Sequence, residues 1–145
     1  MKKTIAVVAM LSGLALAGCQ SAPPPEPANP TAQKTTYSGM LPCADCSGIR
    51  TTLVLYRDQF ANPTRFELRE EYLKGSTVTL SAIERGDWDS TSKVRGTTEY
   101  RIFTINPQDP SGKRQYLKDA VNAIEMLDKD GKRIDSNLNY RLLKK

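Results

Sequence analysis

Histidine is absent from the 145 residues of this chain. Its absence removes the commonest general base, the commonest protein metal ligand and every nucleophile that a histidine activates. Cysteine is scarce as well, with three residues in all, at positions 19, 43 and 46. These shortages disfavour an enzymatic function and confine sulfur chemistry to three positions.

The sequence also lacks an apolar run of the roughly 20 residues that a helix needs to cross a bilayer. Its apolar segment from Ile5 to Leu16 is shorter and follows Met1-Lys2-Lys3, which is the pattern of a secretory signal. The segment ends in Leu16-Ala17-Gly18-Cys19, which resembles the lipobox of bacterial lipoproteins. This resemblance implies a signal peptide over residues 1–18, a diacylglycerol on the thiol of Cys19 and an acyl chain on its new amino group.

Ordinary signal cleavage after Ala17 is the alternative, and it would leave Cys19 as a free thiol. An unpaired cysteine is unusual in an oxidising compartment, whereas lipidation leaves an even number of thiols. The lipoprotein interpretation is therefore favoured. Several acyl chains would anchor the protein stably, since each buried methylene contributes about 0.8 kcal/mol.

Residues 19–35 read as the lipidated cysteine and a tether. Five prolines fall at positions 23, 24, 25, 27 and 30, with almost no apolar side chain between them. Such a segment favours extended polyproline II and holds a domain away from the membrane. In bacterial lipoproteins an aspartate after the lipidated cysteine commonly causes retention in the inner membrane. Gln20 stands there instead, which implies an outer-membrane anchor with the protein facing the periplasm.

The charge of the chain is mildly basic. The formal net charge of +5 includes Lys2 and Lys3 of the signal, so 19 of the 21 basic residues remain beside 16 acidic ones, leaving +3. This excess is too small to indicate nucleic-acid binding.

Residues 36–145 are predicted to form one all-β domain of about 110 residues. In the segment Arg65 to Tyr72, apolar residues at 66, 68 and 72 alternate with charged ones, which is typical of a half-buried strand. Similar runs are Ile49 to Tyr56, Thr77 to Ile83, Thr98 to Ile105, Gln115 to Lys118, Ala123 to Leu127 and Asn139 to Leu143. The turn signals between them are Asn62-Pro63, Lys74-Gly75, Arg85-Gly86, Asn106 to Gly112 and Asp130-Gly131.

Six to eight short strands with tight turns predict a small antiparallel meander barrel, which also hides the sheet edges. Tyr116 to Met126 is the segment where a helical turn is the alternative. Asp128-Lys129-Asp130-Gly131 resembles the start of a calcium loop, but the later ligands are missing and a hairpin turn is preferred. Trp88 and the aromatic residues at positions 66, 72, 100 and 103 would fill the barrel core or line a ligand cavity, and the filled core is preferred.

The segment from Leu41 to Gly48, sequence LPCADCSG, holds the two cysteines that remain for chemistry. Cys43 and Cys46 can close a small disulfide, exchange disulfides with a partner, or bind a soft metal. Cu(I) prefers thiolate and thioether ligands, so Met40 is a candidate third ligand beside the two cysteines. A thiol-disulfide oxidoreductase is less favoured, because the sequence shows no βαβ pattern. No helix N-terminus or adjacent cation is evident that would activate a thiol, and the nearest cation in sequence is Arg50.

Together these features resemble the NlpE family of lipoproteins, which is linked to copper homeostasis and to activation of the Cpx envelope-stress response. The resemblance rests mainly on Tyr37 to Ile49, within which Gly-x-Leu-Pro-Cys-x-x-Cys-x-Gly-Ile fixes most positions. Supporting matches are Thr52-Leu53-Val54-Leu55, Gly86, Trp88 and Ala123-Ile124-Glu125-Met126-Leu127-Asp128 before Asp130-Gly131. It implies a lipocalin-like barrel over residues 36–145, corresponding to the family's N-terminal domain; longer members continue into a second, OB-fold domain with another cysteine pair.

The function implied by this resemblance is that of a non-enzymatic, outer-membrane-anchored sensor or adaptor. Its expected partner is an inner-membrane sensor kinase of the Cpx type, reached when sorting or folding of the lipoprotein fails. In this hypothesis the tether sets the reach of the barrel, and Cys43 and Cys46 report metal or redox state. Two alternatives stay open: a carrier of a small apolar ligand or lipid, and a thiol-disulfide oxidoreductase. No cofactor is expected with certainty, copper being the candidate.

Overall fold

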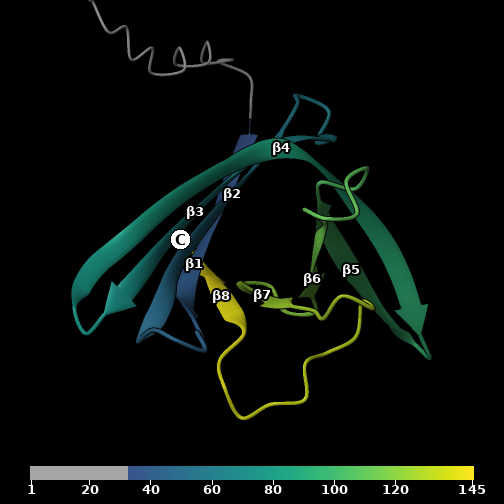
Figure 1. Cartoon of the computed structure of the whole chain (residues 1–145). Helices are drawn as coiled ribbons and strands as arrows, with labels where there is room; N and C mark the ends of the chain where they lie inside the picture. The colour runs from purple at the N-terminus through teal and green to yellow at the C-terminus, as the bar shows by residue number, and fades with distance from the viewer. Residues whose placement is uncertain (1–32) are drawn as a thin grey trace, which may run out of the picture.

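The computed structural model describes residues 33–145, and this part of the chain is all β (Figure 1). Its strands are β1 (Gln33–Leu41), β2 (Gly48–Arg57), β3 (Pro63–Lys74), β4 (Thr77–Arg95), β5 (Thr98–Ile105), β6 (Arg114–Lys118), β7 (Ala123–Met126) and β8 (Arg141–Lys144). Each pairs antiparallel with the next, and β8 returns to β1 to close a barrel. The predicted antiparallel meander barrel is confirmed. Among residues 33–145 there is no helix of the length and apolar character needed to traverse a bilayer.

Closure of the barrel depends on a residue without a side chain. β8 meets β1 through the pairs Tyr37–Lys144 and Ser38–Leu143. A Cβ added at the next residue, Gly39, would lie 2.7 Å from the carbonyl oxygen of Arg141, which is closer than real Cβ contacts. Glycine at position 39 therefore lets the last strand approach the first.

The core is the inner face of the barrel, and alternation along the strands fills it. On β2, Leu53 and Leu55 are buried, and Phe66 and Leu68 are buried opposite them on β3. The other buried members of this core cluster are Tyr37, Leu41, Trp88, Phe103, Ile105, Tyr116, Ile124 and Leu142. Trp88 packs edge-on against Phe103 with ring centroids 5.2 Å apart, which is a favourable aromatic geometry.

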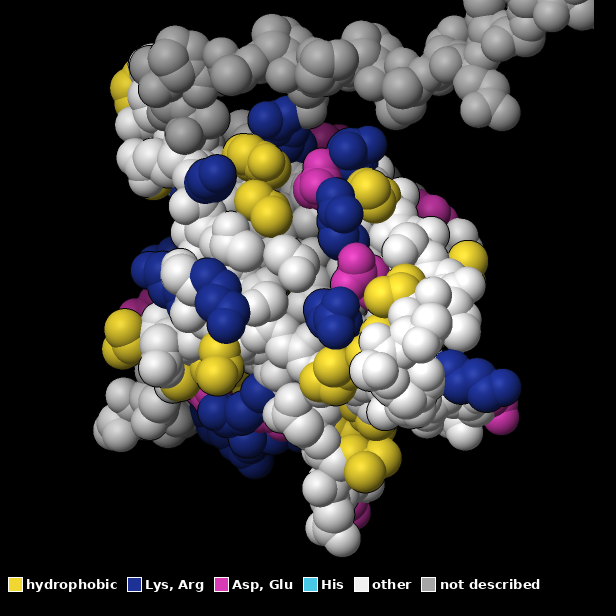
Figure 2. Space-filling model, turned by 90° about the vertical axis from the view of Figure 1, so that its left-hand side faces the viewer, with side chains coloured by type: hydrophobic (Ala, Val, Ile, Leu, Met, Phe, Trp, Pro, Cys, Tyr) yellow, Lys and Arg dark blue, Asp and Glu magenta, His cyan; other side chains and the backbone are white. Residues whose placement is uncertain are grey.

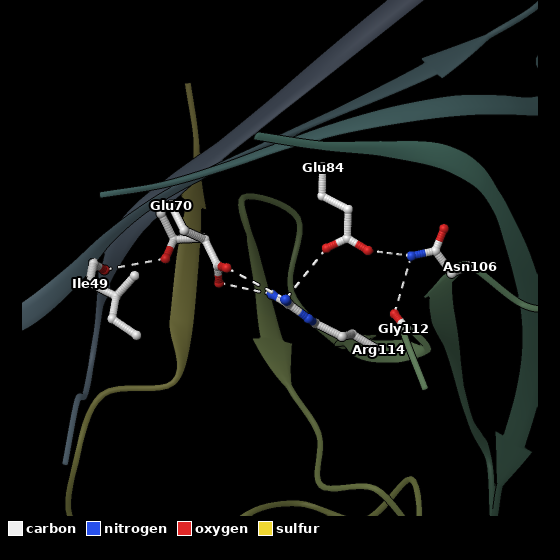
Figure 3. Close-up of polar contacts among 7 residues, drawn as sticks. Ile49, Glu70, Glu84, Asn106, Gly112 and Arg114 are labelled. Carbon is white, nitrogen blue, oxygen red and sulfur yellow. Dashed lines mark hydrogen bonds and ion pairs between the residues drawn. The ribbon is translucent and has the colours of Figure 1, made fainter. Parts of the chain in front are cut away.

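Towards the cysteine-loop end of the barrel, the inward side chains are charged and paired (Figure 3). Arg114 of β6 donates hydrogen bonds of 2.8 and 3.4 Å to the two carboxylate oxygens of Glu70 on β3. Its second terminal nitrogen also lies 3.4 Å from Glu84 of β4, which in turn accepts a hydrogen bond from the side-chain amide of Asn106. These contacts link three strands across the barrel and compensate charges that are partly removed from water.

The structure corrects three predictions about the strands. β1 begins at Gln33, so residues 33–35 belong to the sheet although they were assigned to the tether. Arg85-Gly86 is not a turn, because both residues pair with β3 inside the long strand β4. Tyr116 and Met126 lie on the neighbouring strands β6 and β7, so the alternative of a helical turn there is wrong.

Candidate functional site

The two cysteines lie in the hairpin loop that joins β1 to β2. These strands pair from Gln33–Arg57 down to Leu41–Ile49, so the loop covers residues 42–47. The Sγ atoms of Cys43 and Cys46 are bonded at 2.01 Å, with Cα atoms 5.3 Å apart. Both cysteines are half-buried, whereas the intervening Ala44 and Asp45 are exposed. The disulfide thus closes a small ring at one end of the barrel, with its middle open to solvent.

The loop is held against the turn between β3 and β4. The backbone N–H of Ser47 donates to the carbonyl oxygen of Leu73 at 2.8 Å, and the hydroxyl of Ser47 accepts from the N–H of Gly75 at 2.7 Å. Gly48, which begins β2, has a φ of 154°, a conformation that favours glycine. These constraints fix the position of the loop independently of the disulfide.

Met40 lies next to this loop at the end of β1. Its side chain is on the outer face and 43% exposed, and its Sδ lies 2.9 Å from the place where a Cβ on Gly48 would be. Gly48 is two residues after Cys46, so the structure gathers all three sulfur-bearing residues of the predicted Cu(I) site at one hairpin. Residues 33–145 contain no group of three or more His, Cys, Asp or Glu residues placed to share a metal ion. A soft metal would therefore depend on these sulfurs.

The cation nearest to the cysteines in sequence does not contact them. Arg50 donates to Glu71 at 2.9 Å across the β2–β3 pair, on the outer face of the sheet. It is therefore engaged in an exposed ion pair and does not stabilise a thiolate in the loop. In the disulfide form neither cysteine titrates, so metal binding requires prior reduction.

The middle of the barrel is filled by packed side chains and does not resemble the cavity of an apolar-ligand carrier. Trp88, Phe66 and Phe103, all candidates for lining such a cavity, are packed into the core. A groove of about 840 Å³ lies instead on the outer face, between β4–β6 and the 127–133 hairpin. In that hairpin the carboxylate of Asp128 accepts hydrogen bonds from the backbone N–H groups of Asp130 and Lys132. Residues 128–131 therefore form the predicted hairpin turn and not a calcium loop.

Comparison with known proteins decides the family. Residues 37–137 match the NlpE N-terminal domain, which is more than half of the chain. The chain belongs to the NlpE family.

A curated relative, lipoprotein NlpE of Escherichia coli strain K12, is 29% identical over 147 aligned residues. The alignment covers 97% of this chain and 56% of the relative, so the chain spans about half the length of that NlpE protein. No solved structure matched. Family membership confirms the resemblance predicted from the cysteine segment.

Cys19, the predicted lipidation site, and the signal peptide lie outside the described residues.

The sequence analysis missed the charged side chains that point into the barrel, namely Arg57, Glu70, Glu84, Arg101, Arg114, Lys118 and Lys144. The sequence pattern could have revealed their inward orientation, because each of these residues lies an even number of positions from an inward apolar residue on its strand.

Proposed function

We propose that this chain is a non-enzymatic lipoprotein of the outer membrane that acts in envelope-stress signalling and copper homeostasis. The observation that carries the proposal is the cysteine pair in a fixed hairpin loop, on a barrel of the NlpE family. The name of the Escherichia coli relative, lipoprotein NlpE, supports lipidation of Cys19 by analogy. The lipid would anchor the barrel to the periplasmic face of the membrane.

The mechanism we propose is one of location and of sulfur state. A protein that is not sorted or folded correctly stays near the inner membrane, where its barrel contacts a sensor kinase of the Cpx type. Oxidised Cys43 and Cys46 form the ring seen in the loop. A dithiol reductant, itself oxidised to a disulfide, would supply two electrons and two protons and free two thiols on the hairpin whose first strand ends with Met40 and Leu41. The reduced loop then offers ligands that suit Cu(I).

Copper uptake by the reduced protein tests the metal part of this proposal. Wild-type protein should take up one Cu(I) per chain, and Cys43→Ser with Cys46→Ser should abolish this uptake. Met40→Leu should weaken it, whereas Met126→Leu, which alters a partly buried methionine of β7 that packs on the core, should not. Undiminished uptake by the double cysteine variant would end the copper proposal.

Signalling and anchoring are tested in cells. Overproduction should induce an envelope-stress reporter whose output depends on the sensor kinase. Cys19→Ser should remove the acyl chains, and mass spectrometry of protein isolated from membranes should detect them on the wild type together with the thiol state of Cys43 and Cys46. An unmodified Cys19 in membrane-purified protein would contradict the proposed anchor.

A further inference from the structure

At the barrel end opposite the cysteine loop, four basic residues lie at inward positions. Arg57 continues the inward series of Leu53 and Leu55 to the end of β2. Arg101 of β5 is paired with Lys118 of β6, and both follow the inward register of Phe103 and Tyr116. Lys144 of β8 is paired with Tyr37 of β1, whose side chain is buried in the core. This cationic mouth, defined as Arg57, Arg101, Lys118 and Lys144, therefore draws its charge from four strands.

These cations have no acidic partner among residues 33–145. The ion pairs in this part of the chain use other basic residues, including Arg114, which faces inward near the cysteine loop. The nearby carboxylate of Asp119 is already paired with Arg133 and Arg141. Glu99 lies two residues before Arg101 and lines a neighbouring surface hollow with it, but forms no ion pair with the four. With Glu99 counted beside the four cations, the mouth carries a net positive charge.

The charges are close enough to affect one another. The pKa of Lys118 is lowered by burial and further by the charges of Lys144 and Arg101. The pKa of Arg57 is lowered by burial and by Arg101. Mutual repulsion of this kind is relieved when an anion binds between the cations.

Two of the basic groups are held in place before any ligand arrives. The guanidinium of Arg57 stacks over the ring of Trp88, with 4.4 Å from Cζ to the ring centroid, and donates to the carbonyl oxygen of Ala61 at 2.9 Å. The ammonium of Lys118 donates to the carbonyl oxygens of Ala120 and Val121 at 2.9 and 3.3 Å. Each group retains further N–H donors, since a guanidinium has five and an ammonium three.

A hollow of about 180 Å³ opens between these side chains. It is lined by Arg57, Lys118 and Lys144, by the hydroxyl-bearing Thr35 and Tyr37, and by the ring of Phe103. Drug-sized ligands occupy cavities of about 300–1,000 Å³, so this smaller hollow suits a small polar group. Several convergent cations and two hydroxyl groups match the charge and the many acceptor oxygens of a tetrahedral oxyanion.

We propose that the cationic mouth binds a phosphate group, either as free phosphate or as the phosphate of a lipid head group. The head group is a relevant source because Gln33, the first residue of β1, is paired with Arg57, so the chain enters the barrel at this end. The anchor proposed at Cys19 would bring the mouth towards the membrane surface. The phosphate site itself does not depend on that anchor.

Calorimetric titration of the full chain in a non-ionic detergent, at constant ionic strength, tests the site. One arm uses sodium phosphate and the other uses a short-chain phosphatidic acid, with sodium chloride and a short-chain diacylglycerol, which lacks the phosphate, as references. We expect saturable binding of one phosphate per chain. Lys118→Gln with Lys144→Gln should weaken it at least tenfold, whereas Lys93→Gln with Lys132→Gln, on the outer groove, should leave it unchanged.

A second readout comes from Trp88, the only tryptophan of the chain. Since Arg57 stacks on it, phosphate that binds Arg57 should change the Trp88 emission with the same midpoint as the calorimetric titration. Binding of inorganic phosphate supports a site for the free anion, and binding of phosphatidic acid alone supports a head-group site. Binding of neither ligand, or equal losses in the two double variants, would overturn the proposal.

Discussion

The hydroxyl oxygen of Ser47 accepts a hydrogen bond of 2.7 Å from the backbone N–H of Gly75. This contact joins two loops that are 28 residues apart in sequence, the cysteine loop and the β3–β4 turn. Gly75 has a φ of 62°, so its N–H is presented by a turn that glycine favours. The cysteine ring is thereby attached to a neighbouring hairpin of the barrel through the residue that follows Cys46.

Ser47→Ala should destabilise the protein by about 0.5–1.5 kcal/mol, because the backbone N–H of Gly75 loses its protein partner, although both residues are exposed to water. Urea unfolding followed by circular dichroism measures this change. Ser76→Ala is the matched control, since Ser76 lies in the same turn and forms no side-chain hydrogen bond with residues 33–145. Equal stability of the Ser47 and Ser76 variants would show that the tie between the loops contributes nothing.

The sequence predicts the barrel well because most of its strands alternate between apolar and charged residues. β3 is an example, with Phe66 and Leu68 inside and Glu67 and Arg69 outside. Alternation fails at β1, whose first residues are polar and follow a proline-rich segment. Their place in the sheet is set by pairing with β2, a contact distant in sequence that a local pattern does not reveal.

Gly86 illustrates a second limit of sequence reasoning. Arg85-Gly86 has the composition of a turn, yet Gly86 is paired with Phe66 in the middle of β4. A Cβ at this position would collide with the side-chain oxygen of Asn106 and lie 3.0 Å from the ring of Phe66. The glycine makes room for neighbours inside the barrel, and only the assembled fold shows them.

The sequence identified the sulfur-bearing residues of the candidate site, but it did not reveal which charged side chains point into the barrel. The two cysteines and Met40 were identified from residue type and spacing, and the structure places them at one hairpin. The inward cations were missed because a lysine or arginine on a strand normally faces solvent. Their orientation follows from the register of the closed barrel, as the pairing of Arg101 with Lys118 illustrates.

The ion pair between Glu70 and Arg114 supports a prediction about charge burial. The Glu70 side chain is only 12% exposed, so Arg114→Leu should leave a carboxylate with poor access to water. We expect a loss of about 1–3 kcal/mol in the free energy of unfolding. Adding Glu70→Gln to Arg114→Leu should recover part of this loss, because the unpaired charge is removed.

A double-mutant cycle of Glu70→Gln and Arg114→Leu in urea measures this coupling. The control cycle uses Glu67→Gln and Arg85→Leu, an outer-face pair whose arginine side chain is 52% exposed. Its contact distance of 2.9 Å is close to the 2.8 Å of the inner pair. Exposed pairs contribute about 0.2–1 kcal/mol. A coupling energy no larger for the inner pair than for the outer one would contradict the role assigned to Glu70 and Arg114.

Removal of the disulfide should leave the barrel folded. Cys43 and Cys46 are separated by three positions, so their ring constrains the unfolded chain less than a loop of about 15 residues, for which the gain is about 3 kcal/mol. The hydrogen bonds of Ser47 to the β3–β4 turn do not involve the sulfurs. Cys43→Ser with Cys46→Ser should therefore cost less than about 3 kcal/mol.

Urea unfolding of the wild type with and without a reductant, beside the double cysteine variant, checks this prediction. Reduction should lower the stability of the wild type to that of the variant and leave the variant unaffected. Loss of the β-sheet circular dichroism signal on reduction, without denaturant, would show instead that the ring is required for the fold.

Because of Tyr116, the free energy of unfolding of the barrel should fall as the pH rises above about 10. Its side chain is fully buried, and its hydroxyl has no hydrogen-bond partner among residues 33–145. Burial raises its pKa to about 12, and the nearby guanidinium of Arg114 opposes this rise. The unfolded tyrosine ionises near pH 10, so the stability that Tyr116 contributes is complete below pH 10 and is lost as the pH rises towards 12.

Between these values the loss should be about 1.4 kcal/mol per pH unit. Tyr116→Phe removes both this ionisation and an unpaired buried hydroxyl, so the variant should match or exceed the wild type at pH 8 and gain on it above pH 10. Urea unfolding at pH 8, 10 and 11 measures the difference. Tyr140→Phe, at a partly exposed position, is the control and should not change the pH dependence in the same way. Parallel pH profiles for the wild type and Tyr116→Phe would show that this tyrosine ionises alike in the folded and unfolded chains.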